Sequence, residues 1–279
     1  MKKITRILAI TLMLALLMIA SACGPQADQL QPPEEERVPQ AEQQEPQEPQ
    51  EPEVVKQLTM VTNADFPPYE FREGSEIVGI DPEIAAAIAE KLGMELVIED
   101  IDFDSVIISV ETGMFDMAMA GLTVTEERME QVSFSISYAN GVQAIIVPEG
   151  SSITSVDDLF EEGASHSIGV QLSTTGDLYS TWDLEDEGLA TIERFARGSD
   201  AVMALTSGRI DAVIIDNEPA RAFVAVNPGL KILDTEFANE DYAIALNKGN
   251  TELLAQVNQA LGELIADGTV QAILDKYIN

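Results

Sequence analysis

The sequence predicts a two-lobed α/β protein within residues 58–279, and three features of the chain carry this prediction. Short apolar strands alternate with helical patterns, which is typical of mostly parallel sheets flanked by helices. The second half of the chain repeats this alternation with strands and helices of its own. Two further apolar segments, residues 142–147 and 242–246, flank that second set on both sides. Each lobe is therefore expected to be a mostly parallel sheet with flanking helices.

The two flanking segments are the expected crossover strands between the lobes. If the chain leaves through the first and returns through the second, lobe one holds residues 58–141 and 246–279. Lobe two then holds residues 142–245, including the hinge strands. Two lobes joined by two strands enclose a cleft that can open and close about a hinge.

Lobe one begins with strands and helices whose limits follow from apolar periodicity. Asp81 and Pro82 give an expected helix cap and a first-turn proline. Apolar residues then recur at helical spacing up to Leu92, and Gly93 suits the end of that helix. The predicted strands are residues 58–62, 95–99 and 115–120, and the predicted helices are residues 81–92 and 105–111.

Lobe two repeats the alternation. Its predicted strands are residues 167–171, 190–195, 211–215 and 231–233, separated by helices over residues 174–182, 199–207 and 219–226. Two closing helices, residues 252–266 and 270–277, are expected to return to lobe one.

The N-terminus has the pattern of an export signal, predicted over residues 1–22. Basic residues precede an apolar run over residues 7–19, and the small residues Ala20, Ser21 and Ala22 follow. The run is shorter than the roughly 17 residues that a spanning helix needs. Cleavage after the small residues is therefore expected, and the alternative is an uncleaved membrane helix.

Cys23 is the only cysteine of the chain, so an intrachain disulfide is excluded. Its position resembles a bacterial lipobox, in which the cysteine becomes lipidated, with palmitate among its acyl chains. Ala20 departs from that pattern, because leucine is usual there. The expected location is the extracytoplasmic face of the cell membrane, which is the periplasmic side in a cell with two membranes. The alternative is an ordinary signal peptidase, which would release a soluble protein.

Residues 23–57 are predicted to be the lipidated cysteine followed by a disordered tether. Beyond Gly24 the segment is almost wholly Pro, Gln and Glu. Low hydrophobicity, acidic charge and frequent proline prevent such a segment from building a core. A spacer that holds a folded domain away from a membrane fits this composition, and a docking segment for a partner is the alternative.

The folded part of the chain is strongly acidic, and this excludes nucleic acid as a partner. The whole chain has a formal net charge of −34, and residues 58–279 contain ten basic and 40 acidic side chains. Phosphate binding needs a basic face. In such a chain a single well-placed arginine is noticeable.

One stretch, residues 120–128, combines groups that suit a carboxylate. Gly121 allows a ligand to approach backbone N–H groups, and Thr123 supplies a hydroxyl. Arg128 offers a planar fork that matches two carboxylate oxygens. The alternative is a strand-to-helix turn with Thr125 as its cap and Arg128 in solvent.

Short motifs in a fixed order make the chain resemble one family over essentially all of residues 58–279. They are TNADFPPYE (62–70), VGID (78–81), FD (103–104 and 115–116), AGLTVTEER (120–128), FS (134–135), GRIDA (208–212) and Asp216. The chain resembles the extracytoplasmic solute-binding proteins of family 3, the polar amino-acid binders of ABC importers with the type II periplasmic-binding-protein fold. The resemblance implies a monomer without cofactor or catalysis, which captures a free amino acid and delivers it to the transmembrane subunits of a permease with a separate ATPase.

For the ligand's carboxylate, the resemblance implies a clamp by Arg128 together with the glycine and threonine that precede it. In lobe two, Ser173, Thr174 and Thr175 follow a strand and open a helix, where N–H groups favour an anion. The family places donors at the position of Thr175, and Thr174 beside it is a further candidate. Plain capping of the helix by Ser173 is the alternative.

For the ligand's ammonium, the resemblance implies Asp216. This residue ends a predicted strand at its carboxyl edge, where ligands of α/β proteins usually bind. The alternative is that Asp216 caps the helix that follows. Phe66 and Phe103 match aromatic positions that sandwich the ligand's side-chain stem in the family. Aromatic walls exclude water and strengthen ion pairs, although without the resemblance both would be ordinary core residues.

The choice of ligand side chain rests on three positions without a charged residue. Asn63 stands where glutamine binders carry an acid, Gln171 where they carry a lysine, and Ile215 where they carry a histidine. We therefore expect a neutral polar amino acid as ligand, with the two amide side chains as hydrogen-bonding candidates.

No metal site, cofactor or catalytic residue is expected. His166 lies far from any second metal ligand and is expected on a surface loop, and Trp182 is expected to be a packing residue. No phosphate loop or nucleophile elbow occurs. One alternative is an enzyme resembling cyclohexadienyl dehydratases, with Glu70 or Asp65 as its general acid. The other is an extracytoplasmic amino-acid sensor.

Overall fold

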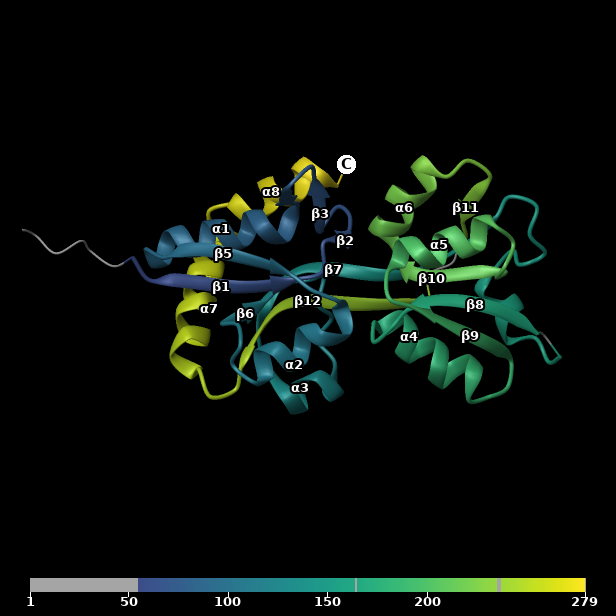
Figure 1. The fold of residues 1–279 in the computed structure, drawn as a ribbon, viewed down its shortest axis with the longest axis horizontal. Helices are drawn as coiled ribbons and strands as arrows, with labels where there is room; N and C mark the ends of the chain where they lie inside the picture. Colours follow the sequence, from purple (N-terminus) through teal and green to yellow (C-terminus); the bar gives the residue numbers. More distant parts are fainter. Residues whose placement is uncertain (1–54, 164, 235–236, 279) are drawn as a thin grey trace, which may run out of the picture. The chain divides into compact units, whose positions relative to one another are not determined.

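Two long antiparallel strands connect the two groups of elements in the computed structural model (Figure 1), which describes residues 55–163, 165–234 and 237–278. They are β7 (Val132–Pro148) and β12 (Ala238–Asn247). The predicted signal peptide, Cys23 and the predicted tether before residue 55 lie outside the described residues. Among those residues, none of the helices combines the length and apolar character needed to span a bilayer.

Lobe one is built around three parallel strands. Strand β1 (Gln57–Thr62) lies between β5 (Glu95–Asp100) and β6 (Met117–Ala118). Alternate residues of β1 serve the two faces, since Met60 packs in the cluster of α1 and α7 while Val61 packs in that of α2. The helices of this lobe are α1 (Ile80–Leu92), α2 (Val106–Glu111), α3 (Glu126–Gln131), α7 (Thr251–Ala266) and α8 (Thr269–Tyr277).

A small three-stranded sheet precedes α1 in the same lobe. It consists of β2 (Asp65–Phe66), β3 (Glu70–Glu73) and β4 (Glu76–Val78), which pair in antiparallel fashion. A single 3₁₀ turn, Phe103–Ser105, precedes α2, which covers all but the first residue of the predicted helix over residues 105–111.

Lobe two holds its own three parallel strands, β8 (His166–Gln171), β9 (Ala190–Phe195) and β10 (Ala212–Asp216). Strand β11 (Leu230–Ile232) adds to β7 in antiparallel fashion. The helices are α4 (Thr175–Ser180), α5 (Gly198–Thr206) and α6 (Asn217–Val226), with a 3₁₀ turn at Val156–Phe160 and a π-helical turn at Thr181–Glu185. In Figure 1, α5 and α6 lie on one side of the lobe-two strands and α4 on the other.

One continuous sheet runs through both lobes in the order β5-β1-β6-β12-β7-β10-β8-β9. The crossover strands are longer than predicted, because β7 alone has 17 residues. Its first part is rich in Ser and Asn, which usually indicate turns, yet it pairs with β12, as in Asn140 opposite Asp241. The lobe limits at residues 141 and 245 stay predictions, since both strands run through these points without a break.

Two local predictions are wrong. Asp81 does not cap α1, because the helix begins at Ile80 with Gly79 as its N-cap, at φ 133°. A Cβ at Gly79 would collide with the carbonyl oxygen of Tyr69, so only glycine fits there. His166 is the first residue of β8 and not part of a loop, because its backbone pairs with Ala190 of β9.

Candidate ligand-binding site

A narrow cavity between the lobes is lined by every residue that the sequence analysis assigned to the ligand. Its free volume is only about 10 Å³, roughly what one water molecule needs, so the two walls are almost closed on each other. Its lining consists of Asn63, Phe66, Phe103, Ala120, Gly121, Thr123, Arg128, Gln171, Thr174, Thr175 and Asp216. Only Ala120 was not among the ten predicted residues. The cavity therefore brings together side chains from the ends of several strands, as the carboxyl edge of a sheet predicts.

Arg128 is the buried cation of this cavity. Thr125 caps α3 by accepting the N–H of Arg128, as the simple turn interpretation predicted, but the side chain is buried and not solvated. Its Nη1 donates to the carbonyl of Thr123 at 2.9 Å, and its Nη2 donates to the carbonyl of Ser173 at 3.1 Å. The guanidinium also lies 5.6 Å from the ring centre of Phe103. Burial lowers the pKa of Arg128, while Glu240 and Asp216 act against that shift.

The lobe-two wall of the cavity is the loop over residues 171–175. Thr174, and not Ser173, is the N-cap of α4, because its hydroxyl accepts the N–H of Asp177. The same hydroxyl donates to the carbonyl of Gln171 at 2.7 Å. The hydroxyl of Thr175 is buried and lies 3.4 Å from that of Thr123, so the two walls meet at this point.

Asp216 ends β10 and is buried at the cavity. It occupies the N-cap position of α6, yet its side chain makes no capping bond, which removes the capping alternative. Its carboxylate instead accepts the hydroxyl of Tyr242 from β12. The pKa of Asp216 is raised to about 7, mainly by burial and in addition by the nearby carboxylate of Glu240.

The sequence analysis missed three polar residues that surround Asp216 and Thr123. Glu240 accepts from the hydroxyl of Thr123 at 2.9 Å and from the amide of Gln143 at 3.2 Å. Glu240 and Tyr242 lie on β12, and Gln143 lies on β7, so the crossover strands supply them. No local pattern marks Glu240 in the sequence, because its neighbours Asn239 and Asp241 are polar as well, and the predicted strand began only at residue 242.

The other end of the cavity carries the two amide side chains. Gln171 donates to the side-chain oxygen of Asn63 at 3.0 Å across the lobes, and Asn63 donates to the carbonyl of Ile101 at 2.8 Å. Phe66 is buried beside them and packs on Tyr69, with ring centres 5.9 Å apart.

The N–H of Gly121 does not face a ligand, although the sequence analysis expected that it would. Its N–H donates to Asp81 at 3.0 Å, so this donor is already in use. A Cβ at this residue would lie 2.6 Å from Phe66 Cε1, and its φ is 53°, so the position requires glycine. Asp81 also accepts from the hydroxyl of Tyr138 at 2.8 Å, and burial raises its pKa to about 6.

The two acids proposed for a dehydratase do not line the cavity. Asp65 accepts the N–H and the hydroxyl of Ser199, at 3.3 and 2.8 Å, which joins the lobes outside the cavity. Glu70 is fully buried beside Asp81, and burial raises its pKa well above the ordinary value. Within the described ranges no group of three or more His, Cys, Asp or Glu side chains is placed to hold a metal ion. Trp182 is half exposed and contacts Tyr179, so it is not a core residue.

The sheet and the cavity define a two-lobed α/β protein that encloses a small polar site between its lobes. The chain belongs to the bacterial extracellular solute-binding proteins, family 3, whose family model matches residues 58–279. The predicted fold class, the type II periplasmic-binding-protein fold, is thereby confirmed together with the family.

Individual relatives support this assignment. Over 225 residues the chain is 34% identical to the arginine-binding extracellular protein ArtP of Bacillus subtilis (strain 168), covering 80% of this chain and 86% of ArtP. The solved structure of an ancestral arginine-binding protein bound to glutamine is 40% identical, with a TM-score of 0.74, covering 81% of this chain and 99% of that one. The ancestral amino acid-binding protein AncCDT-1, a precursor of cyclohexadienyl dehydratase, is 30% identical with a TM-score of 0.71, covering 80% and 95%.

The pKa of Asp216 gives a test of the site in solution. Because the folded state holds this proton up to about pH 7 and the unfolded state loses it near 4, the carboxyl contributes stability that is complete below about pH 4 and is lost as the pH rises through 7. Asp216→Asn removes this titration. We expect its unfolding free energy, relative to wild type, to increase steadily between pH 4.5 and 7.5 in urea titrations.

Val226→Ala is the control, since this exposed side chain on α6 of lobe two carries no titrating group. Its difference from wild type should stay constant over the same range. A constant difference for Asp216→Asn as well would contradict a raised pKa at this site.

Proposed function

We propose that this chain captures a free amino acid in the cavity between its lobes and presents the closed form to the permease of an ABC importer, whose ATPase is a separate subunit. One observation carries the proposal: a buried arginine and a buried aspartate, Arg128 and Asp216, line the same small cavity. A free amino acid carries a carboxylate and an ammonium two bonds apart, so it can satisfy both charges at once. The protein would act by binding, without catalysis.

The carboxylate end of the site centres on Arg128. A guanidinium has five N–H donors, more than the two carbonyl bonds that hold this one. Bonds between a guanidinium and a carboxylate are charge-assisted and stronger than bonds to neutral carbonyls. The hydroxyls of Thr123 and Thr175, from the two walls, are the further donors at this end.

The two walls contact each other directly, so a ligand can enter only when they separate. We infer a hinge in β7 and β12, with residues 58–141 and 246–279 as one lobe and residues 142–245 as the other. The bonds between Arg128 and Ser173 and between Gln171 and Asn63 then break on opening and reform around the ligand. Affinity therefore depends on both lobes.

For the ligand side chain, we propose a neutral polar group. Asn63 and Gln171 offer amide donors and acceptors at that end of the cavity, and no charged side chain lines it there. Phe66 and Phe103 supply apolar walls for the stem of the side chain. The related ancestral protein with bound glutamine is consistent with this choice.

Arginine is the second candidate. Two buried carboxyl groups, Asp216 and Glu240, lie near Arg128, which is the one buried cation in the part of the chain that the structure describes. A ligand with an additional positive charge would therefore balance the site. Relatives named as arginine binders favour the same ligand. The amide oxygens of Asn63 and Gln171 can accept from a guanidinium as well as from an amide.

A dehydratase or a sensor on this scaffold receives less support. AncCDT-1 shows that the fold is close to a precursor of an enzyme. In this chain, however, neither Asp65 nor Glu70 lines the cavity, so the two acids considered for that chemistry are not placed beside the proposed ligand.

A ligand panel tests the function. Because a ligand that binds only the native state raises its apparent stability, we expect L-glutamine to raise the melting temperature of the mature protein and to bind in calorimetry. The panel contains the twenty amino acids and L-cystine, with prephenate and arogenate turnover assays beside it. Tight binding of arginine, lysine or glutamate without any glutamine, cystine or other neutral ligand would overturn the neutral preference. No binding by any of them would overturn capture of an amino acid.

The charge clamp makes a second prediction. Arg128→Ala and Asp216→Ala should each weaken binding of the ligand found in the panel by about 2–5 kcal/mol, because the opposite charge of the ligand is left buried and unpaired. Isothermal titration calorimetry measures the loss, and Arg221→Ala, an exposed arginine on α6, is the control that should bind normally. Normal binding by either clamp variant shows that the site is assigned wrongly.

We further propose that Cys23 carries lipid and anchors the mature chain on the extracytoplasmic face of the membrane. The proposal is supported by the small residues before Cys23 and by the acidic Pro, Gln and Glu segment after it, which suits a spacer. In a bacterial host, wild type should partition into the membrane fraction and carry the mass of attached acyl chains. Cys23→Ser should not, and equal membrane partition of both proteins would exclude the anchor.

A further inference from the structure

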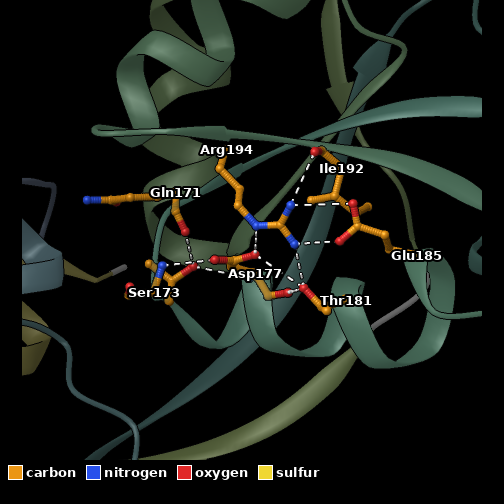
Figure 2. Close-up of polar contacts among 8 residues, drawn as sticks. Gln171, Ser173, Asp177, Thr181, Glu185, Ile192 and Arg194 are labelled. Carbon is orange, nitrogen blue, oxygen red and sulfur yellow. Dashed lines mark hydrogen bonds and ion pairs between the residues drawn. The ribbon is translucent and has the colours of Figure 1, made fainter.

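A buried aspartate and an arginine lie behind the lobe-two wall of the cavity, outside its lining (Figure 2). Asp177, in the first turn of α4, accepts the backbone N–H of Ser173 through Oδ2 at 3.0 Å. Its other oxygen, Oδ1, accepts Nε of Arg194 from β9 at 2.8 Å. Both carboxylate oxygens are thus used, one by the loop over residues 171–175 and one by a neighbouring strand.

Arg194 is itself held on several sides. Its Nη2 donates to Glu185 at 2.6 Å and to the hydroxyl of Thr181 at 2.8 Å. That hydroxyl in turn donates to the carbonyl of Asp177 at 2.8 Å. Figure 2 shows the guanidinium between the two carboxylates. Because a planar guanidinium with several fixed partners loses little further freedom, it can keep Asp177 in one orientation.

The loop over residues 171–175 contains an unfavourable backbone conformation that the bond to Asp177 can stabilise. Ser173 is the one residue other than glycine in the described ranges with a positive φ, 66°, and this left-handed conformation is unfavourable for a residue that carries a Cβ. Its carbonyl accepts Arg128 from the opposite wall. Asp177 holds the peptide N–H on one side of Ser173, and the φ and ψ of Ser173 then determine where the carbonyl on its other side points.

Ordinary helix capping does not account for this contact. In a capping box the acid at the third helical position bonds the N–H of the N-cap residue. The N-cap here is Thr174, whereas Asp177 bonds the N–H of Ser173, one residue earlier. The bond therefore holds the loop in front of the helix.

We propose that Asp177 and Arg194 are positioning residues for the amino-acid site. They hold Ser173 in its left-handed conformation and thereby place Thr175 and Gln171 at the cavity and the Ser173 carbonyl against Arg128. The inference rests on the proposed function, because it concerns the same cavity. Neither residue lines the cavity, but both are expected to affect its affinity for the ligand.

The test compares two substitutions at one position. Asp177→Asn keeps an oxygen that can accept the Ser173 N–H, whereas Asp177→Ala removes it. We expect Asp177→Asn to bind L-glutamine or L-arginine, whichever binds wild type, within about threefold of the wild-type Kd. Asp177→Ala should bind at least tenfold more weakly. Arg194→Gln breaks the same Asp177–Arg194 pair as Asp177→Asn does, so it should bind about two- to threefold more weakly than wild type. A merely structural role would lower the melting temperature without separating the affinities of these two Asp177 variants.

Arg209→Gln is the matched control, since Arg209 pairs with Glu193 of the same strand β9 but does not contact the loop. It should bind as wild type does. Titrations are made well below the melting temperature of each ligand-free variant, so that all proteins are folded. The inference for Asp177 is overturned if the Kd of Asp177→Ala lies within threefold of the wild-type Kd, or if the two Asp177 variants have the same Kd. Normal binding by Arg194→Gln overturns it for Arg194. If wild type binds neither amino acid, the proposed function fails first, and the inference fails with it.

Discussion

The burial of opposite charges in a small space is the constraint on which this structure depends. A guanidinium taken out of water is costly unless its donors are bonded. Arg128 meets that condition only because Thr123 and Ser173, from opposite walls, both turn a carbonyl toward it. The left-handed backbone of Ser173 and the bond that its N–H donates to Asp177 follow from the same requirement. The buried charge of Arg128 therefore constrains the loop over residues 171–175 and, through Asp177, its partner Arg194 on β9.

The acidic side of the cavity depends on the crossover strands in a similar way. Tyr242 and Glu240 on β12 and Gln143 on β7 all contribute to the surroundings of Asp216. The strands that connect the lobes thus also tune the charge of the site. Asp216 ends β10, which pairs with β7, and Glu240 lies on β12, which pairs with β7 as well. The pairing of these three strands therefore sets the distance between the two buried carboxyl groups and, with it, the proton affinity of Asp216.

Cavity residues could be predicted from the sequence where neighbouring residues form a recognisable pattern. They could be predicted less well where their role depends on the pairing of distant strands. Residues 120–128 contain their own signal, because a glycine, a threonine and an arginine follow an apolar strand. Glu240 and Gln143 gave no such signal, since each becomes important only when β12 pairs with β7. Asp81 is intermediate: its place before a proline suggested a cap, but its partner is Gly121, which is distant in sequence.

The count of hydrogen-bond donors limits how a carboxylate can be held here. The N–H of Gly121 is bonded to Asp81, and the hydroxyl of Thr123 is bonded to Glu240. A hydroxyl has one proton, so Thr123 can turn to a ligand only by giving up Glu240. Losing that bond takes one of its hydrogen-bond donors from the buried Glu240. An ammonium beside Asp216 acts against this cost, because a nearby positive charge favours the ionised form of that carboxyl. A ligand that carries both groups therefore brings a cation to the acidic end of the cavity when its carboxylate takes the hydroxyl of Thr123.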